Sequence, residues 1–221
     1  MKVWRITMVG LAIGLAMAAG VRAEPFPNLS DAKTTARAYH DDGDYERDIA
    51  QVADWAIAWI EHRATQRTAD ERLVVLMDVD ETVLSNYPHM DEQDFGYVPS
   101  VWVEWVERAA APAIEPIKRV FEAARKHDMV VIFLTGRGEP EETAGTIENL
   151  QHVGMGDFER IIFRGAEDTA PTAAERKLLR RIQLEEEGWT IIASLGDQGS
   201  DLAGGHAERI FKLPNPFYRV P

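Results

Sequence analysis

The chain has 221 residues and a formal net charge of −13, with 45% hydrophobic and 28% charged residues. This balance is typical of a globular protein and excludes disordered and collagen-like chains. The negative charge argues against nucleic acid or anionic lipid as a partner, because both bind basic surfaces. The chain has no cysteine, which excludes disulfides, thiolate metal sites and cysteine nucleophiles.

The first 23 residues have the pattern of a secretory signal peptide. Lys2 and Arg5 precede an apolar run, and Val21 and Ala23 supply the small residues of a cleavage site after Ala23. The alternative is a membrane anchor, but the apolar run has about 14 residues where a span takes about 20. We therefore expect residues 1–23 to be removed, leaving a periplasmic or secreted protein with no stable membrane anchoring.

The next segment, residues 24–67, is expected to form an N-terminal helical extension. Ile49, Val52, Ala56 and Ile60 recur at three- and four-residue spacing, which predicts an amphipathic helix over about residues 45–61 that packs against another part of the protein.

From residue 68 onward, short apolar runs alternate with helical patterns. The runs are Leu73–Met77, Met129–Leu134, Ile161–Phe163, Thr190–Leu195 and Ile210–Leu213, and the helical patterns cover about 101–110, 115–127, 139–152 and 173–187. Buried strands separated by helices predict an α/β fold with a mostly parallel sheet and helices on both faces.

Four aspartates follow two of these predicted strands. Asp78 and Asp80 come directly after the first strand, and Asp197 and Asp201 come after the fourth. Ligands bind at the carboxyl ends of strands in open α/β sheets, so these carboxylates should meet at one edge. They would repel one another unless a cation is bound, and oxygen ligands favour Mg²⁺, with Mn²⁺ or Ca²⁺ as alternatives. The competing interpretation is that they are solvated loop residues.

A carboxylate-bound Mg²⁺ commonly holds a phosphate as well. The Thr135 hydroxyl and the Gly136 N–H, expected at a strand-to-helix junction, are suitable phosphate donors. Lys177, in the first turn of a predicted helix, is a candidate for balancing the phosphate charge. Its neighbours Arg176, Arg180 and Arg181 leave open the alternative of a solvated basic face.

These motifs together form a family pattern. The chain resembles the haloacid dehalogenase (HAD) superfamily, and more closely its subfamily IIIB acid phosphatases, which include secreted bacterial enzymes and plant vegetative storage proteins. The motifs that carry the resemblance are Asp78-Val79-Asp80-Glu81-Thr82, Leu134-Thr135-Gly136-Arg137, Gly196-Asp197-Gln198 with Asp201, and Phe211-Lys212-Leu213-Pro214-Asn215-Pro216. The resemblance implies a Rossmann-like, three-layer α/β/α phosphatase domain over residues 68–221, with a small cap insertion at about 83–128.

The resemblance also implies roles for single residues. Asp78 would be the nucleophile that forms an aspartyl-phosphate, and Asp80 the general acid and base. Mg²⁺ would be held by Asp78, the backbone carbonyl of Asp80 and Asp197, with Asp201 binding it directly or through a neighbouring ligand. Thr135, Gly136 and Lys177 would bind the phosphate of a small phosphomonoester. Arg176 departs from the family, because plant members carry an aromatic residue there.

A cap as short as residues 83–128 predicts an open site with a broad substrate range. Its aromatic residues are candidates for lining a pocket that stacks on the leaving group: Tyr87, Phe95, Tyr97, Trp102 and Trp105. For Trp102 and Trp105, the i, i+3 spacing favours packing of a helix onto the core over lining a pocket. His89 is a candidate substrate contact, although a lone histidine in a loop is usually a surface residue.

Three functions are consistent with the sequence. The first is a secreted, Mg²⁺-dependent acid phosphatase. The second is a catalytically weak storage or binding protein on the same scaffold, against which the intact set of Asp78, Asp80, Lys177 and Asp197 argues. The third is a phosphotransferase that passes phosphate to a second alcohol rather than to water.

Overall fold

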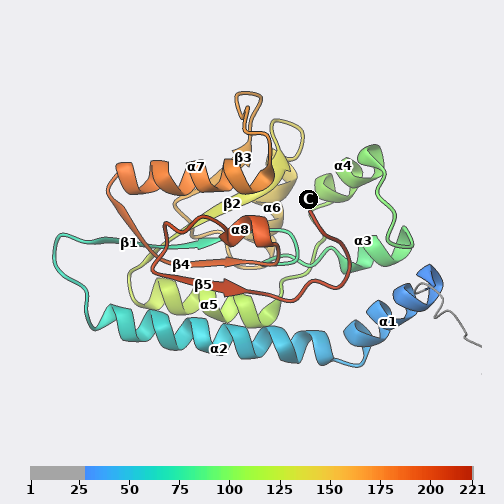
Figure 1. Ribbon diagram of the computed structural model, residues 1–221, viewed down its shortest axis with the longest axis horizontal. Helices are drawn as coiled ribbons and strands as arrows, with labels where there is room; N and C mark the ends of the chain where they lie inside the picture. The colour runs from blue at the N-terminus through green and yellow to red at the C-terminus, as the bar shows by residue number, and fades with distance from the viewer. Residues whose placement is uncertain (1–27, 221) are drawn as a thin grey trace, which may run out of the picture.

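A computed structural model describes residues 28–220 of the chain, so the expected signal peptide and its cleavage site lie outside the described residues. The centre is a five-stranded, wholly parallel sheet in the order β3-β2-β1-β4-β5 (Figure 1). The strands are β1 (Arg72–Met77), β2 (Val130–Gly138), β3 (Arg160–Arg164), β4 (Trp189–Gly196) and β5 (Arg209–Lys212). All five predicted strands are confirmed.

Eight helices accompany the sheet in the described part of the chain. They are α1 (Leu29–Asp41), α2 (Asp44–Ala64), α3 (Tyr87–Glu92), α4 (Pro99–Glu107), α5 (Glu115–Lys126), α6 (Thr143–His152), α7 (Ala173–Glu186) and α8 (Gly199–Leu202). The predicted helices at 45–61, 101–110, 115–127 and 173–187 correspond to α2, α4, α5 and α7.

Helices cover both faces of the sheet, as the buried strands require. Leu73, Val75 and Met77 of β1 point into a large core shared with α2, α5 and α6, whereas Val74 and Leu76 point into a smaller core against α7. Figure 1 shows α7 on one side of the sheet and α5 and α2 on the other. The three-layer α/β/α architecture is therefore confirmed.

The helical extension is part of one of these layers. α2 packs lengthwise on α5 and also contacts β4 and β5. The indole Nε1 of Trp59 in α2 donates to the carbonyl of Ile192 in β4 at 2.8 Å. α1 then turns toward α3, where the His40 ring stacks on Tyr87 with ring centres 3.4 Å apart. α2 thus adds to the layer under the sheet, and α1 reaches the cap.

The second strand is longer than predicted. β2 continues to Gly138, which pairs with Arg164 of β3 after an irregularity that begins at Leu134. Thr135 and Gly136 therefore belong to the strand and not to a strand-to-helix junction. α6 correspondingly begins at Thr143 rather than near residue 139.

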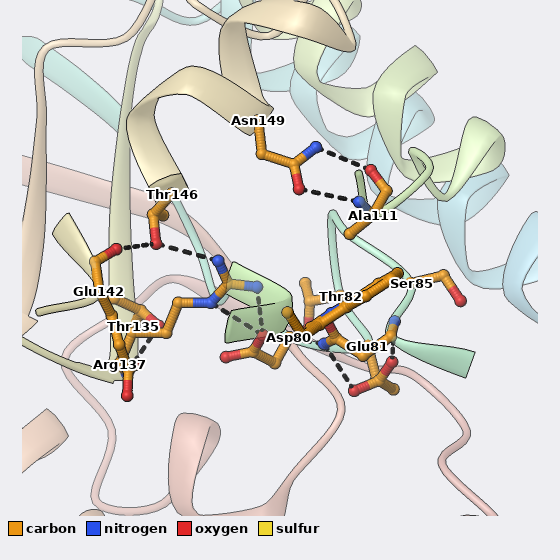
Figure 2. A network of polar contacts seen from close by, with 12 residues as sticks. Asp80, Glu81, Thr82, Ser85, Ala111, Thr135, Arg137, Glu142, Thr146 and Asn149 are labelled. Carbon is orange, nitrogen blue, oxygen red and sulfur yellow. Dashed lines mark hydrogen bonds and ion pairs between the residues drawn. The ribbon is translucent and has the colours of Figure 1, made fainter. Parts of the chain in front are cut away.

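The cap helix α4 sits directly on α6. A Cβ atom at Gly145 of α6 would collide with the backbone carbonyl of Val106 in α4. The side-chain amide of Asn149 in α6 accepts from the backbone N–H of Ala111 and donates to its carbonyl, at 3.0 and 2.8 Å (Figure 2). These contacts hold α4 and the loop after it against α6.

The strand order places a topological switch between β1 and β4. The chain runs outward from β1 through β2 to β3 and then returns to the other side of β1 for β4. A crevice forms outside the carboxyl ends of strands at such a point. The residues that follow β1 and β4 therefore meet there.

Candidate active site

Three carboxylates gather at the switch point. Asp78 follows β1, Asp197 follows β4 and Asp201 lies in α8; all three are buried, and each offers an oxygen within 4.8 Å of the others. Gly196 makes this approach possible, because a Cβ atom there would collide with the Asp201 side chain. The sequence-based expectation that these aspartates converge is confirmed by the geometry.

Lys177 lies among these carboxylates. Its Nζ is 2.5 Å from Oδ1 of Asp78 and 2.6 Å from Oδ1 of Asp201, and the side chain is buried. Its neighbours on α7 have other partners: Arg180 pairs with Asp168 at 2.7 Å, and Arg181 donates to backbone carbonyls around α8. The lysine that the local sequence could not single out is thus the one at the site.

Neutral donors hold the carboxylates in place. The Thr82 hydroxyl lies 3.3 Å from both Oδ2 of Asp78 and Oδ1 of Asp197. The amide groups of Gln198 and Asn215 donate to Oδ2 of Asp197 at 2.5 and 2.6 Å. Asn215 belongs to the C-terminal motif, which carried the family resemblance but no expected role at the site.

The electrostatics of the cluster favour a bound cation. Burial, followed by the charge of Asp201, raises the pKa of Asp197 to about 6. Burial also raises the pKa of Asp78. Burial alone would lower the pKa of Lys177, but the charges of Asp78 and Asp201 raise it overall, so the ammonium stays charged. One lysine cannot balance three carboxylates, and an all-oxygen donor set fits a hard divalent cation such as Mg²⁺.

Asp80 is held apart from this cluster. Its Oδ1 accepts from Nη2 and Nε of Arg137, at 2.7 and 3.0 Å (Figure 2). The same oxygen accepts from Nδ2 of Asn86 at 2.9 Å. Arg137 is buried and is fixed in turn by the Thr146 hydroxyl at 2.9 Å. Within residues 28–220, Oδ2 of Asp80 has no hydrogen-bond partner. Arg137 belongs to the motif Leu134-Thr135-Gly136-Arg137, and no role at the site was predicted for it.

The two predicted phosphate donors of β2 differ in exposure. Gly136 is exposed and lines the space beside the aspartates. Thr135 is fully buried, and its hydroxyl oxygen accepts from the backbone N–H of Arg137 at 3.0 Å. The hydroxyl hydrogen of Thr135 is not committed by that bond, so its role toward phosphate stays a prediction.

Two neighbouring cavities open at this edge. The smaller, about 80 Å³, is lined by Asp78, Asp80, Gly136, Arg176, Lys177, Asp197 and Asp201, among others. The larger has a volume of about 510 Å³ and shares Asp80, Gly136, Tyr218 and Val220 with the smaller. Its other walls come largely from α3, α4, the loop between them and the rest of the C-terminal segment 217–220. The carboxylates thus face a small polar space that leads into a larger one.

The larger cavity is aromatic, but with a different set of residues from the predicted one. Phe95, Tyr97 and Trp102 line it as expected, joined by Phe217 and Tyr218 from the C-terminal segment. Tyr87 and Trp105 do not line it: Tyr87 stacks on His40, and Nε1 of Trp105 donates to the Asn86 amide oxygen at 2.8 Å. Of the tryptophan pair, only Trp105 is buried in the core.

His89 is not the surface residue that a lone loop histidine usually is. It is buried on α3, its ring stacks on Trp105 with centres 5.5 Å apart, and it lines the larger cavity. Burial, the main cause, lowers its pKa, so the imidazole is neutral at physiological pH. His89 lies inside because it belongs to the short helix α3, which was not predicted from the sequence.

Glu81 is a further buried acid that the sequence analysis left without a role. It accepts from the Asn86 backbone N–H at 2.6 Å and from the Tyr218 hydroxyl at 3.0 Å. Burial, followed by the charge of Asp80, raises its pKa to about 8. Glu81 therefore connects the start of the cap to the C-terminal segment beneath the cavity.

Comparisons with known proteins identify the family by sequence and match the fold to a solved structure. The model of HAD superfamily, subfamily IIIB (Acid phosphatase) matches residues 19–221. "Acid phosphatase 1" of Solanum lycopersicum is 37% identical over 80% of this chain and 69% of that protein. "Stem 28 kDa glycoprotein" of Glycine max is 34% identical over 66% of this chain and 59% of that protein. The class C acid phosphatase from Bacillus anthracis has the same fold, with a TM-score of 0.71 and 22% identity over 86% of each chain.

Proposed function

The chain belongs to subfamily IIIB of the HAD superfamily, the acid phosphatases, and from this premise we propose that it hydrolyses small phosphate monoesters through an aspartyl-phosphate on Asp78, with Mg²⁺ as cofactor. The observation that carries the proposal is the separation of two aspartates. Asp78 lies against Lys177, whereas Asp80 is turned to Arg137 with one oxygen free. This is the arrangement that a nucleophile and a separate proton carrier need.

In the first step a carboxylate oxygen of Asp78 attacks phosphorus. The bond from that oxygen to phosphorus forms, the bond from phosphorus to the leaving oxygen breaks, and Asp80 gives its proton to the leaving oxygen. In the second step a water transfers a proton to Asp80 and its oxygen bonds to phosphorus. The bond between phosphorus and the Asp78 oxygen breaks, which releases phosphate and restores the Asp78 carboxylate. Arg137 fixes the Asp80 side chain through Oδ1, so that Oδ2 can carry the proton in both steps.

The Mg²⁺ would be held by Asp78, Asp197 and Asp201. The backbone carbonyl of Asp80 is predicted to be a further ligand. When bound, the cation neutralises part of the charge that carboxylates and phosphate bring together. Gly136 lines the smaller cavity opposite Lys177, and its N–H with the Lys177 ammonium would bind the phosphate oxygens. The Thr135 hydroxyl is proposed as a further donor.

The larger cavity suggests the leaving group. Its aromatic walls favour flat or aromatic leaving groups such as a phenol or a nucleoside, and its volume of about 510 Å³ is that of a small-molecule site. Small phosphomonoesters are therefore the proposed substrates, and no nucleic-acid polymer is expected.

The proposed place of action is outside the cytoplasm, in the periplasm or the medium. The pattern of residues 1–23 supports this, and cleavage after Ala23 would leave a mature chain of net charge −16, since Lys2, Arg5 and Arg22 are removed. Among the described residues, none of the helices has the length and apolar character needed to cross a bilayer. Intact-mass measurement of exported protein would test the cleavage.

The decisive experiment compares two aspartate variants of the mature protein. Asp78→Asn should abolish phosphate release from nitrophenyl phosphate, a loss of about 10⁴-fold or more, because an amide cannot form the acyl-phosphate. Asp54→Asn removes a carboxylate from the exposed face of α2 and should leave the rate unchanged. Activity of Asp78→Asn near wild type would contradict the nucleophile.

The same assay separates the alternative functions. A wild-type protein that releases no phosphate from aryl, sugar or nucleoside phosphates would be the storage or binding protein that relatives such as "Vegetative storage protein 1" of Arabidopsis thaliana suggest. Formation of glycerol phosphate when glycerol is present would indicate a phosphotransferase. We expect inorganic phosphate as the main product.

A further inference from the structure

Arg176 is a second buried cation beside the expected phosphate position. It lies in the first turn of α7, directly before Lys177, and 5% of its surface is exposed. Its side chain lines the smaller cavity together with Lys177 and Gly136. A Cβ atom at Gly136 would be 4.0 Å from Nη2 of Arg176, so the guanidinium lies against the exposed backbone of β2.

The guanidinium uses few of its donors. Nη1 donates to the backbone carbonyl of Thr135 at 3.1 Å, and this is its one hydrogen bond within residues 28–220. Over the same residues no carboxylate lies within ion-pair distance of it. Burial lowers the pKa of Arg176, although not enough to remove its charge. A buried guanidinium with unused donors is costly unless an anion satisfies it.

The other buried arginines of the described chain are satisfied. Arg137 pairs with Asp80, Arg63 pairs with Glu71 and Glu208, and Arg181 donates from all three guanidinium nitrogens to carbonyls around α8. Arg176 alone among them turns its remaining donors to a cavity. A volume of about 80 Å³ suits a group as small as phosphate.

We propose that Arg176 binds the substrate's transferring phosphate, as a second cation beside Lys177. This inference rests on the proposed function and adds a residue to it. A guanidinium presents parallel N–H donors that match two oxygens of one phosphate, whereas a lysine acts as a point charge. With Asp78, Asp80, Asp197 and Asp201 lining the same space, a phosphate dianion needs more positive charge than Lys177 and one Mg²⁺ supply.

The test measures the affinity for inorganic phosphate by calorimetry, with Mg²⁺ present. Arg176→Gln should weaken phosphate binding by about 10- to 100-fold, as expected for charge-assisted hydrogen bonds. The matched control is Arg180→Gln, which removes the same charge one turn along α7 from an arginine paired with Asp168. It should change the affinity by less than about two-fold.

Each outcome decides the proposal. Equal affinities for wild type and Arg176→Gln overturn it, as does an equal loss in both variants, which would show only a long-range charge effect. If Arg176→Gln does not fold, a crystal structure of the wild type with Mg²⁺ and inorganic phosphate takes its place. A guanidinium nitrogen of Arg176 should then lie within hydrogen-bond distance of a phosphate oxygen, and a phosphate bound without that contact overturns the proposal.

The failure of this inference is distinguishable from failure of the proposed function. If the wild type hydrolyses nitrophenyl phosphate and binds inorganic phosphate while Arg176→Gln binds it equally well, only the role of Arg176 falls. If the wild type neither binds nor releases phosphate, the proposed function is wrong, and the inference about Arg176, which rests on it, is wrong as well.

Discussion

The two cavities of the site are built in different ways. The small one is formed mainly by Gly136 of β2 and by residues that follow β1 and β4 or lie at the start of α7, so the buried sheet fixes most of their positions; Tyr218 and Val220 of the C-terminal segment complete it. The large one is assembled from α3, the loop before α4, and the C-terminal segment 217–220, which are far apart in sequence. The difference indicates that the chemistry depends on the core of the fold, whereas leaving-group selection depends on peripheral segments.

Removal of the metal should have the largest effect on the rate of phosphate release. This effect should come from the small cavity alone. Exhaustive chelation with EDTA is expected to abolish phosphate release, because Asp78, Asp197 and Asp201 would then repel the substrate. Added Mg²⁺ should restore the rate and raise the melting temperature, since a ligand that binds only the folded state stabilises it. Full activity after chelation would show that the mechanism does not use a metal ion.

Replacing the proton carrier should separate two classes of substrate. Asp80→Asn should slow the hydrolysis of alkyl phosphates by about 100- to 10,000-fold, the range for loss of a general acid. Nitrophenyl phosphate should suffer far less in its first step, because nitrophenolate leaves without a proton. Since Asp80 also activates the water, the mutant should release a burst of nitrophenol and then turn over slowly.

The control for this variant is structural. Asn retains the shape of Asp80 but leaves Arg137 without a counter-ion, so an unchanged circular-dichroism spectrum must accompany the kinetics. Equal losses for both substrates and no burst would mean that Asp80 only supports the fold or the metal, and the acid would have to be another residue.

The small cavity was largely predictable from sequence. Asp78, Asp80, Asp197 and Asp201 were identified because they directly follow apolar runs, and the ends of parallel strands meet at one edge whatever the rest of the chain does. Lys177 needed the family pattern, because its local surroundings match those of Arg180 and Arg181. Arg137 and Asn86 were missed as partners of Asp80, since no spacing relates side chains that meet across β2 and the cap.

The large cavity was predicted less well, for a physical reason. Phe217 and Phe95 stack with ring centres 6.0 Å apart although more than 100 residues separate them, and no local pattern encodes such a contact. Tyr87 was a candidate for lining the cavity but does not line it, because its orientation depends on His40, which lies outside the local helix pattern. Trp105 packs in the core, as its i, i+3 spacing with Trp102 favoured. The helix α3 around His89 is too short to show a periodicity.

A change in the wall of the large cavity should alter binding and leave the chemistry intact. Tyr97 is an exposed lining residue, 69% accessible, with no hydrogen bond from its hydroxyl to described residues. Tyr97→Ala should raise KM for nitrophenyl phosphate by about 3- to 10-fold, the value of one aromatic contact. KM for glycerol phosphate and both kcat values should stay within about two-fold.

Tyr97→Phe is the matched variant, because it retains the ring and should behave like the wild type. A fall in kcat for both substrates after Tyr97→Ala would show that the cavity wall also positions the small cavity, and the separation between the two regions would be wrong.

The smallest expected effect concerns how α1 holds the large cavity in place. Lys33 and Arg37 of α1 pair with Asp91 and Asp94 near the end of α3, and Nζ of Lys33 lies 2.5 Å from Oδ2 of Asp94. These pairs are exposed, so each contributes little, and salt weakens them. The hydrogen bond from Lys33 is the main cause that lowers the pKa of Asp94 below its ordinary value, and the hydrogen bond from Arg37 is the next. A carboxylate with a lowered pKa stabilises the folded state fully above its unfolded pKa of about 4.

That contribution is lost as the pH falls from about 4 through the lower pKa of the folded state, because protonation removes the charge of Asp94. The protection factors of the amides, which correct the exchange rate for its intrinsic dependence on pH, should therefore fall in residues 29–41 and 87–94 at pH 3 or in 1 M salt, while the strands of the sheet stay protected. Arg37→Gln should produce the same local change at pH 6, with a small decrease in melting temperature. If exchange in β1 and β4 rises in parallel, the two regions unfold as one unit, and the sheet does not hold the small cavity independently of the cap.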